Sequence, residues 1–246
     1  MRELVAEIGR AGVFAGRILV SLVPQRGSFA DLVRQIYSIG GRTVPIVAVG
    51  GLFVGLVMSL QGYRTLSTFG ASNALGTLLG LTLYRELGPV LTALLFCGRA
   101  GSSIAAELGL MRATDQIAAL SMMAIDPVRK AVVPRFLAGV VAVPLLTAVF
   151  CAFAIFGGYV QAVHVLGIDA GHYWSGLQGS VSLVNDYGQA FTKALVFGAV
   201  TSLIATYAGY HAEPTIEGTS RATTQAVVSG SLMVLFLDFL LSALLY

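Results

Sequence analysis

Five long stretches of this sequence are apolar and almost free of charge, and each is about as long as a bilayer is thick. A transmembrane helix needs about 20 mostly apolar residues, because it rises about 1.5 Å per residue through a hydrocarbon core about 30 Å thick. Only 11% of the residues are charged, whereas ordinary globular domains carry about a quarter. The sequence therefore predicts an all-α integral membrane protein with five transmembrane helices.

The predicted spans cover residues 43–63, 75–110, 128–163, 190–210 and 222–246. The second is too long for one straight span, and Arg85-Glu86 interrupts it just before Gly88-Pro89. We predict a broken helix there, and the sequence leaves open whether the residues before it form a re-entrant or a continuous helix. Pro144 is expected to kink the third span.

The first 40 residues precede the spans and have the pattern of two amphipathic helices, separated by a break at Pro24–Gly27. In the first helix, apolar residues recur at helical spacing, and charged residues follow a neighbouring face: Glu3, Glu7, Arg10 and Arg17. Helices of this kind lie in the membrane interface. A soluble helix that binds a partner is the alternative.

The distribution of basic residues predicts the orientation in the membrane. If the N-terminus is cytoplasmic, eleven Lys or Arg residues lie on the cytoplasmic side and three on the other, with Arg99 left inside the membrane. Because cytoplasmic loops are enriched in Lys and Arg, we expect a cytoplasmic N-terminus and an extracytoplasmic C-terminus. The connection 164–189 is then extracytoplasmic, and Tyr173 and Trp174 are expected at headgroup level.

A charged segment, MRATDQIAALSMMAIDPVRK, occupies residues 111–130 between two apolar tracts. It predicts a short helix over about 114–125, capped by Thr114 or Asp115 and ended at Asp126-Pro127, where Asp126 is expected to cap the next helix. A dozen or so residues cannot cross a bilayer. The apolar side of this helix could lie on the lipid surface or dock in a groove of a soluble partner. That side consists of Ile117, Leu120 and Ala124, with Met122 and Met123 beside them.

Several kinds of chemistry have no support in the sequence. Cys97 and Cys151 lie in apolar tracts as small hydrophobic residues, and the three histidines have no zinc-site spacing, so no metal site is predicted. There is no phosphate-binding G-x-x-x-x-G-K-[ST] loop and no dinucleotide-binding fingerprint. Energy for any transport must therefore come from another subunit or from an ion gradient.

Two stretches of the chain resemble the core of the MlaE-type permeases of ABC transporters. They are LYRELGPVLTALLFCGRAGSSIAAELGLMRATDQIAALSMMAIDPVRKAVVPRFLAG and GYHAEPTIEGTSRATTQAVVSGSL. The likeness covers nearly the whole chain, and the R-E-L-G-P, G-R-x-G-S and M-R-A-T-[DE]-Q blocks are very specific together. It implies one permease domain over 1–246 in the inner membrane of a bacterium with an outer membrane. There the permease would move phospholipids and maintain outer-membrane lipid asymmetry.

The resemblance also implies partners. Such permeases are homodimers that work with an ABC ATPase, a periplasmic MCE-domain lipid-binding protein and a small cytoplasmic STAS-domain protein. The partner ATPase binds ATP and Mg²⁺, so this non-catalytic chain needs no cofactor, and no nucleic acid is involved. The helix at 114–125 would be the coupling helix seated in the ATPase. Its coupling residues would be Arg112, Thr114, Asp115, Ile117, Leu120, Met122, Met123 and Asp126.

Ionisable residues inside the spans are the candidates for a site, because charges in the membrane usually face a cavity or a partner. Arg85, with Glu86 beside it, could hold a headgroup phosphate, whose oxygens match the planar guanidinium; the alternative is a simple interfacial anchor. Arg99 and Glu107 lie two helical turns apart, and we expect a structural ion pair there rather than a role in gating.

Lys193 and Asp238 stand at comparable depth near the outer ends of the last two spans, where a mutual ion pair would explain both. A proton relay is the less favoured reading. Acyl chains of a lipid would suit the outer half of the first span and the residues after it. These candidates are Leu56, Val57, Leu60, Tyr63, Leu66 and Phe69, although such residues commonly face bulk lipid or a neighbouring helix instead.

Two other functions stay open from the residues alone. An ion-coupled secondary transporter would work without an ATPase, but transporters of that class often have internal repeats and central charges. No repeat is evident here, and the charges gather near the membrane faces. A structural scaffold for a lipid-binding ring is the third possibility. Identifying what co-purifies from native membranes separates all three.

Overall fold

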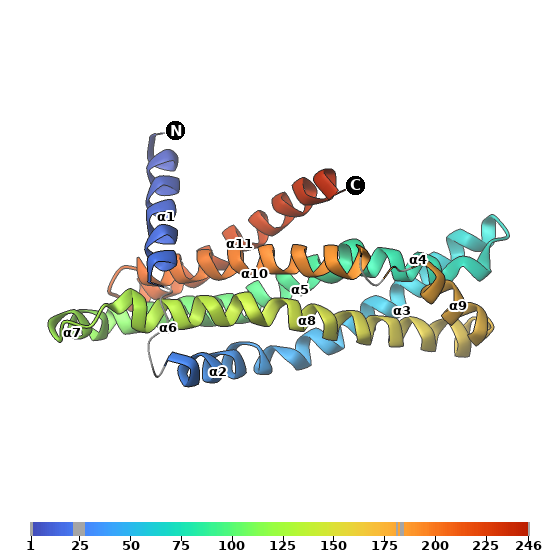
Figure 1. Cartoon of the computed structure of the whole chain (residues 1–246), viewed down its shortest axis with the longest axis horizontal. Coiled ribbons are helices and arrows are strands. Elements are labelled where there is room, and N and C mark those ends of the chain that lie inside the picture. The colour runs from blue at the N-terminus through green and yellow to red at the C-terminus, as the bar shows by residue number, and fades with distance from the viewer. Residues whose placement is uncertain (1, 22–27, 181, 183–184, 246) are drawn as a thin grey trace. The chain divides into compact units, whose positions relative to one another are not determined.

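The computed structural model describes residues 2–21, 28–180, 182 and 185–245, and they contain helices and no strand (Figure 1). The predicted break at Pro24–Gly27 and the last residue of the fifth span, Tyr246, lie outside these residues. The α-helices are α1 (Arg2–Val20), α2 (Ser28–Ile39), α3 (Val44–Thr68), α4 (Leu75–Thr82), α5 (Gly88–Phe96), α6 (Ser102–Ala113), α7 (Gln116–Met122), α8 (Val133–Tyr159), α9 (Ala170–Ser180), α10 (Asn185–Tyr210) and α11 (Ile216–Leu245).

Five helical segments of the described residues are long and apolar enough to cross a membrane, which confirms the predicted fold class. They are Leu32–Thr68, Ser72–Ala113, Val128–Val165, Asp186–Tyr210 and Ile216–Leu244. The first extends beyond the predicted end at residue 63, because a charge at Arg64 does not stop a helix. A long basic side chain can reach the membrane surface while its backbone stays helical.

The contacts divide the chain into two compact units. Unit 1 consists of Met1–Arg42, Phe96–Ala142 and Gly198–Val234, and unit 2 of Thr43–Leu95, Val143–Phe197 and Leu235–Tyr246. Helices α8, α10 and α11 each contribute residues to both units. The expectation of one domain over the whole chain stays a prediction.

In unit 1, α1 packs through two residues one turn apart. Ile18 is 1% exposed and Phe14 is 4% exposed. The Phe14 ring lies 5.6 Å from Tyr207, 5.5 Å from Tyr210 and 5.3 Å from His211. The amphipathic pattern of α1 therefore has a protein partner at the end of α10, in addition to any contact with lipid.

Small residues let the helices of unit 1 approach closely. A Cβ atom on Gly209 of α10 would lie 2.7 Å from the carbonyl oxygen of Ala105 in α6, and one on Gly109 of α6 would lie 2.9 Å from Cγ2 of Thr219 in α11. Both distances are too short for a side chain. Close contact of this kind is a common way for helices to associate in lipid, where no hydrophobic effect drives them together.

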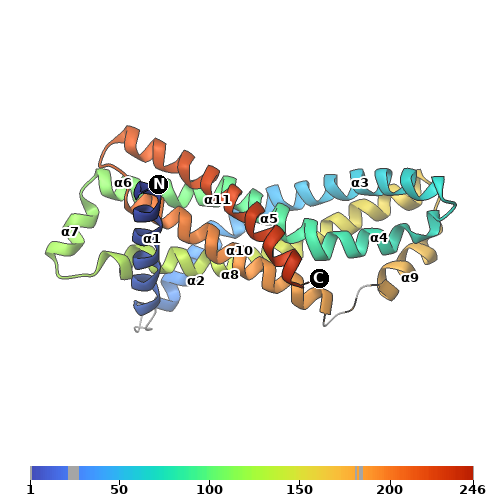
Figure 2. The ribbon, with the colours of Figure 1, turned by 90° about the horizontal axis from the view of Figure 1, so that it is seen from above.

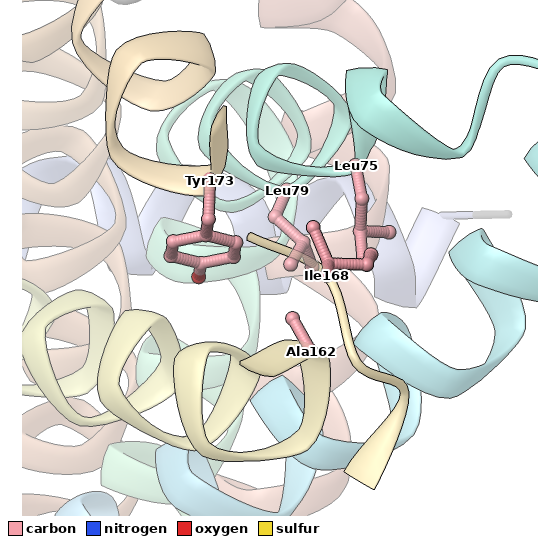
Figure 3. Close-up of a cluster of buried hydrophobic side chains, with 5 residues drawn as sticks. All are labelled: Leu75, Leu79, Ala162, Ile168 and Tyr173. Carbon is pink, nitrogen blue, oxygen red and sulfur yellow. The ribbon is translucent and has the colours of Figure 1, made fainter. Parts of the chain in front are cut away.

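In unit 2, the helix α9 lies against α4 around a small apolar cluster (Figure 2). The cluster consists of Leu75, Leu79, Ala162, Ile168 and Tyr173 (Figure 3). The Tyr173 side chain is fully buried, and its hydroxyl donates a 3.0 Å hydrogen bond to the carbonyl oxygen of Ile155. Tyr173 therefore packs inside the protein, whereas Trp174 is 42% exposed, and the expectation that both lie at headgroup level stays a prediction.

The predicted break before Gly88-Pro89 is a π-helical segment, Leu83–Leu87, within an otherwise continuous helical stretch. A second π-helical segment, Cys97–Gly101, contains Arg99. Proline cannot donate a backbone hydrogen bond, and single π turns recur at functional sites in helices. The ionisable residues Arg85, Glu86 and Arg99 thus lie where the helix geometry departs from regular α.

Candidate functional site

Arg85 of unit 2 forms an ion pair that the sequence did not reveal. Its Nε lies 2.7 Å from Oδ1 of Asp186, whose side chain is 3% exposed, and the other oxygen of Asp186 accepts a 2.7 Å hydrogen bond from the Ser182 amide. Asp186 belongs to the first turn of α10, where a carboxylate is favoured by the helix dipole. The one sequence feature that could have indicated this pair was the acidic residue Asp186 at the start of a span.

The Arg85 side chain nevertheless keeps 37% of its surface exposed, and Glu86 beside it is exposed. The ion pair holds the Arg85 guanidinium through Nε. The part of the guanidinium that stays exposed can attract an anion such as phosphate. The phosphate-binding role of Arg85 stays a prediction, as does the role of Glu86.

Lys193 and Asp238 lie together, as the sequence suggested. The Lys193 Nζ is 3.6 Å from Oδ1 of Asp238, and it donates hydrogen bonds of 2.8 Å to the Ser242 hydroxyl and 2.9 Å to the carbonyl oxygen of Arg85. The Lys193 side chain is completely buried, while that of Asp238 is 25% exposed. A buried ammonium needs compensation of this kind, because desolvating a charge costs several kcal/mol.

The six residues considered for acyl chains do not share one environment. Tyr63 and Leu66 pack against the Tyr173 cluster, and Leu56 and Leu60 are half-buried. Val57 and Phe69 are 55% and 79% exposed. A cavity of about 450 Å³ in unit 2 is lined by other residues, including Tyr84, Cys151 and Tyr187. The lipid-binding role of the six stays a prediction.

The short helix α7 is smaller than expected and is not capped as expected. It covers Gln116–Met122 rather than 114–125, and Asp115 before it has a left-handed backbone (φ 56°) without a capping side-chain hydrogen bond. Thr114 instead donates backwards to the carbonyl oxygen of Leu110, at 2.8 Å. Both capping predictions were therefore wrong, because the turn between α6 and α7 brings neither side chain to the α7 amides.

The apolar residues of α7 differ in exposure. Met122 and Met123 are 83% and 62% exposed, whereas Ile117 and Leu120 are half-buried. Figures 1 and 2 place α7 in the connection between α6 and α8. Two exposed methionines on a short connecting helix form an apolar surface without a covering element in the described part of the chain.

Both neighbours of α7 are anchored by charged side chains. Asp126 accepts a 3.0 Å hydrogen bond from the Val128 amide, so it caps the following helix as the Asp126-Pro127 pattern predicted. Arg112 donates a 2.7 Å hydrogen bond to the carbonyl oxygen of Tyr210, at the end of α10. A basic side chain at a helix C-terminus satisfies a carbonyl that has no partner within the helix.

His211 follows α10 and shares this environment. Burial among aromatic rings lowers the pKa of His211, and the positive charges of Arg112 and Arg10 lower it further. A lowered pKa favours the neutral imidazole at neutral pH. The positive charges around the end of α10 therefore come from the arginines.

Glu107 pairs with a different arginine than expected. Its carboxylate lies 3.1 Å from Nε of Arg135, while Arg99 donates a 3.2 Å hydrogen bond to the carbonyl oxygen of Ile39. The prediction of an Arg99–Glu107 pair was wrong. The π-helical segment changes the register between Arg99 and Glu107, and α8 brings Arg135 to the carboxylate instead.

Comparison with known proteins gives consistent results along the whole length. Residues 32–244 match the family model described as Permease MlaE. The chain is 46% identical over 239 residues to the intermembrane phospholipid transport system permease protein MlaE of Haemophilus influenzae, covering 97% of this chain and 92% of that protein. It is 34% identical over 244 residues to a probable ABC transporter permease protein of Rickettsia typhi, covering 99% and 94%. A more distant relative, TRIGALACTOSYLDIACYLGLYCEROL 1 of Arabidopsis thaliana chloroplasts, is 27% identical over 234 residues, covering 95% and 67%.

Proposed function

Because this chain belongs to the MlaE permease family, we propose that it is the membrane subunit of an ABC transporter that moves phospholipids between membranes. The 46% identity to a phospholipid transport permease, together with five apolar spans, carries the proposal. The chain works in the inner membrane and exchanges lipid with a periplasmic MCE-domain protein, which maintains the lipid asymmetry of the outer membrane. A small STAS-domain protein completes the cytoplasmic side.

Nucleotide hydrolysis belongs to a partner ATPase, which holds the ATP and Mg²⁺. The relatives named as ABC transporter permeases support this division of labour. The exposed methionines of α7 supply a docking surface of the adaptable apolar kind that suits a groove in a soluble partner. Force generated in the ATPase would reach the spans through the anchored ends of α6 and α8.

A second copy of the chain is the proposed partner within the membrane. The helix α11 has only 11% of its most apolar window buried, and large apolar residues along it are exposed. These include Val228, Leu232, Leu235, Phe236 and Phe239. Because this span packs so little within the chain, its exposed apolar face can pack against the same helix of a second protomer.

The orientation is tested with two cysteine variants. Gly179 lies on α9 with open space around it, and Ser220 is exposed on α11. With the N-terminus cytoplasmic, Gly179→Cys reacts with a membrane-impermeant thiol reagent added to the periplasm, whereas Ser220→Cys reacts only after the membrane is opened. Native Cys97 and Cys151 are each 1% exposed and contribute little background. The opposite labelling pattern would show that the N-terminus lies on the other side of the membrane.

The phospholipid itself is tested at Arg85. Charged hydrogen bonds are about twice as strong as neutral ones, and lysine keeps the charge but loses the two-pronged contact with phosphate. Phospholipid retained by the purified complex, measured by mass spectrometry, is expected to fall in the order wild type, Arg85→Lys, Arg85→Ala. Asp186→Asn breaks the same ion pair but keeps the Arg85 guanidinium, so it serves as the control for structural effects of losing the pair. Equal lipid occupancy in wild type and Arg85→Ala would leave Arg85 as an anchor only.

A further inference from the structure

A cavity of about 450 Å³ lies between α8 and α10 of unit 2, apart from the residues considered above for acyl chains. Pro144, Ala148 and Ala152 recur one turn apart along α8 and form one wall. Exposed Ala148, Ala152 and Phe191 form its rim, so the cavity opens sideways from the helices. Ligand pockets typically have volumes of about 300–1,000 Å³ and mostly apolar walls with few polar groups.

The cavity is polar at one end and apolar at the other. The hydroxyls of Tyr84 and Tyr187 meet at 2.7 Å at the end where α10 begins. Ala194 and Pro144 line the other end, about 10 Å deeper along the helix axis at about 1.5 Å per residue. This gradient has the direction of a membrane lipid, whose polar part lies at the membrane surface and whose chain points inward.

One hydroxyl in the cavity has hydrogen-bonding capacity left over. Tyr84 is only 8% exposed, and its hydroxyl shares a single hydrogen bond with that of Tyr187. That bond uses one of the two hydroxyl protons, and no acceptor is seen for the other among the residues that the structure describes. A buried donor of this kind is normally satisfied, and the carbonyl oxygen of a lipid ester is a suitable acceptor.

We propose that this cavity binds one acyl chain of a membrane phospholipid, with the Tyr84–Tyr187 hydroxyl pair donating to the ester carbonyl. The unused hydroxyl proton favours a lipid ester over a transmembrane helix of a partner, because the backbone carbonyls of a helix in lipid are already hydrogen-bonded within that helix. The site adds to the proposed phosphate contact at Arg85, and it requires only that the spans lie in a lipid bilayer.

The test uses the full chain with its co-purifying subunits, reconstituted into vesicles of phosphatidylethanolamine and phosphatidylglycerol. A small fraction of the phospholipid carries a photoreactive diazirine in the middle of one acyl chain, and mass spectrometry maps the labelled peptides. Label is expected to concentrate on residues 147–152 and 187–194. Ala148→Trp fills the cavity and should reduce that label about tenfold, as expected for the loss of about two buried methylene contacts.

Leu145→Trp is the matched control, because Leu145 is 58% exposed on the same helix and does not line the cavity. Leu145→Trp should leave the label unchanged. If Ala148→Trp folds poorly, Ala152→Trp provides a second variant that fills the cavity. The proposal would be overturned if all exposed positions on α8 were labelled equally and neither filling variant reduced that label. So would photo-crosslinks from these residues to a helix of another subunit. Neither result depends on the Arg85 series, which tests the proposed function separately.

Discussion

Replacing Lys193 with methionine is expected to destabilise the protein by about 3–5 kcal/mol, the usual cost of removing one partner of a buried ion pair. The Lys193 side chain has no exposed surface, and its ammonium compensates Asp238 at 3.6 Å. Methionine has a similar length and fills the same space, so the change removes charge rather than packing. Thermal unfolding of the purified protein, followed by fluorescence of Trp174, measures the loss.

A double variant separates the ion pair from other effects of the substitution. When both partners of a buried pair become apolar, the desolvation cost disappears with the attraction, and the result is often neutral or stabilising. Lys193→Met combined with Asp238→Leu should therefore recover most of the stability that Lys193→Met loses. Lys130→Met removes the only other lysine, which is exposed, and should change little. Additive losses in the double variant would show that the two charges do not interact.

Introducing aspartate at Met122 is expected to abolish association with the ATPase, even though the permease itself stays intact. Met122 is 83% exposed in the chain, so a carboxylate there remains hydrated until a partner covers it. Burying an unpaired carboxylate costs several kcal/mol, and each 1.4 kcal/mol weakens binding about tenfold. Co-purification of the ATPase and the rate of ATP hydrolysis by the membrane fraction provide the measurements.

Gln116→Asp is the matched control on α7. Gln116 is exposed and opens the first turn of the helix, where an added negative charge is favoured by the helix dipole. It lies on a different side of the helix from Met122, since successive residues are about 100° apart. Equal loss of the ATPase in both variants would assign the effect to charge alone. Full retention in Met122→Asp would remove α7 from the docking surface.

The charged residues of unit 2 stabilise the fold and also fix how its helices are positioned relative to one another. Lys193 bonds to the carbonyl oxygen of Arg85, and Arg85 pairs with Asp186. The start of α10, the π-helical segment before Gly88 and the end of α11 are thereby held to one another through polar contacts. In a membrane such contacts are costly to leave unmade, so they define which helices of the unit belong together.

Local patterns in the sequence were sufficient for the number of spans, for the amphipathic character of α1 and for the start of the helix at Asp126-Pro127. Each depends on hydropathy, periodicity or capping within a few residues, and those properties act along the chain. The same reasoning failed at α7, where Thr114 and Asp115 have the right chemistry for caps but the turn directs them elsewhere.

Partners far apart in the sequence were decided only by tertiary structure. Glu107 pairs with Arg135, 28 residues away, rather than with Arg99 on its own helix, and Arg85 pairs with Asp186 at a separation of 101 residues. Tyrosine is a residue type common at membrane–water interfaces, yet Tyr173 is completely buried between α4 and α8. Periodicity determines which side of a helix is apolar or charged, but not which other helix packs there. That choice depends on how small residues, π-helical turns and buried hydrogen bonds fit together in space.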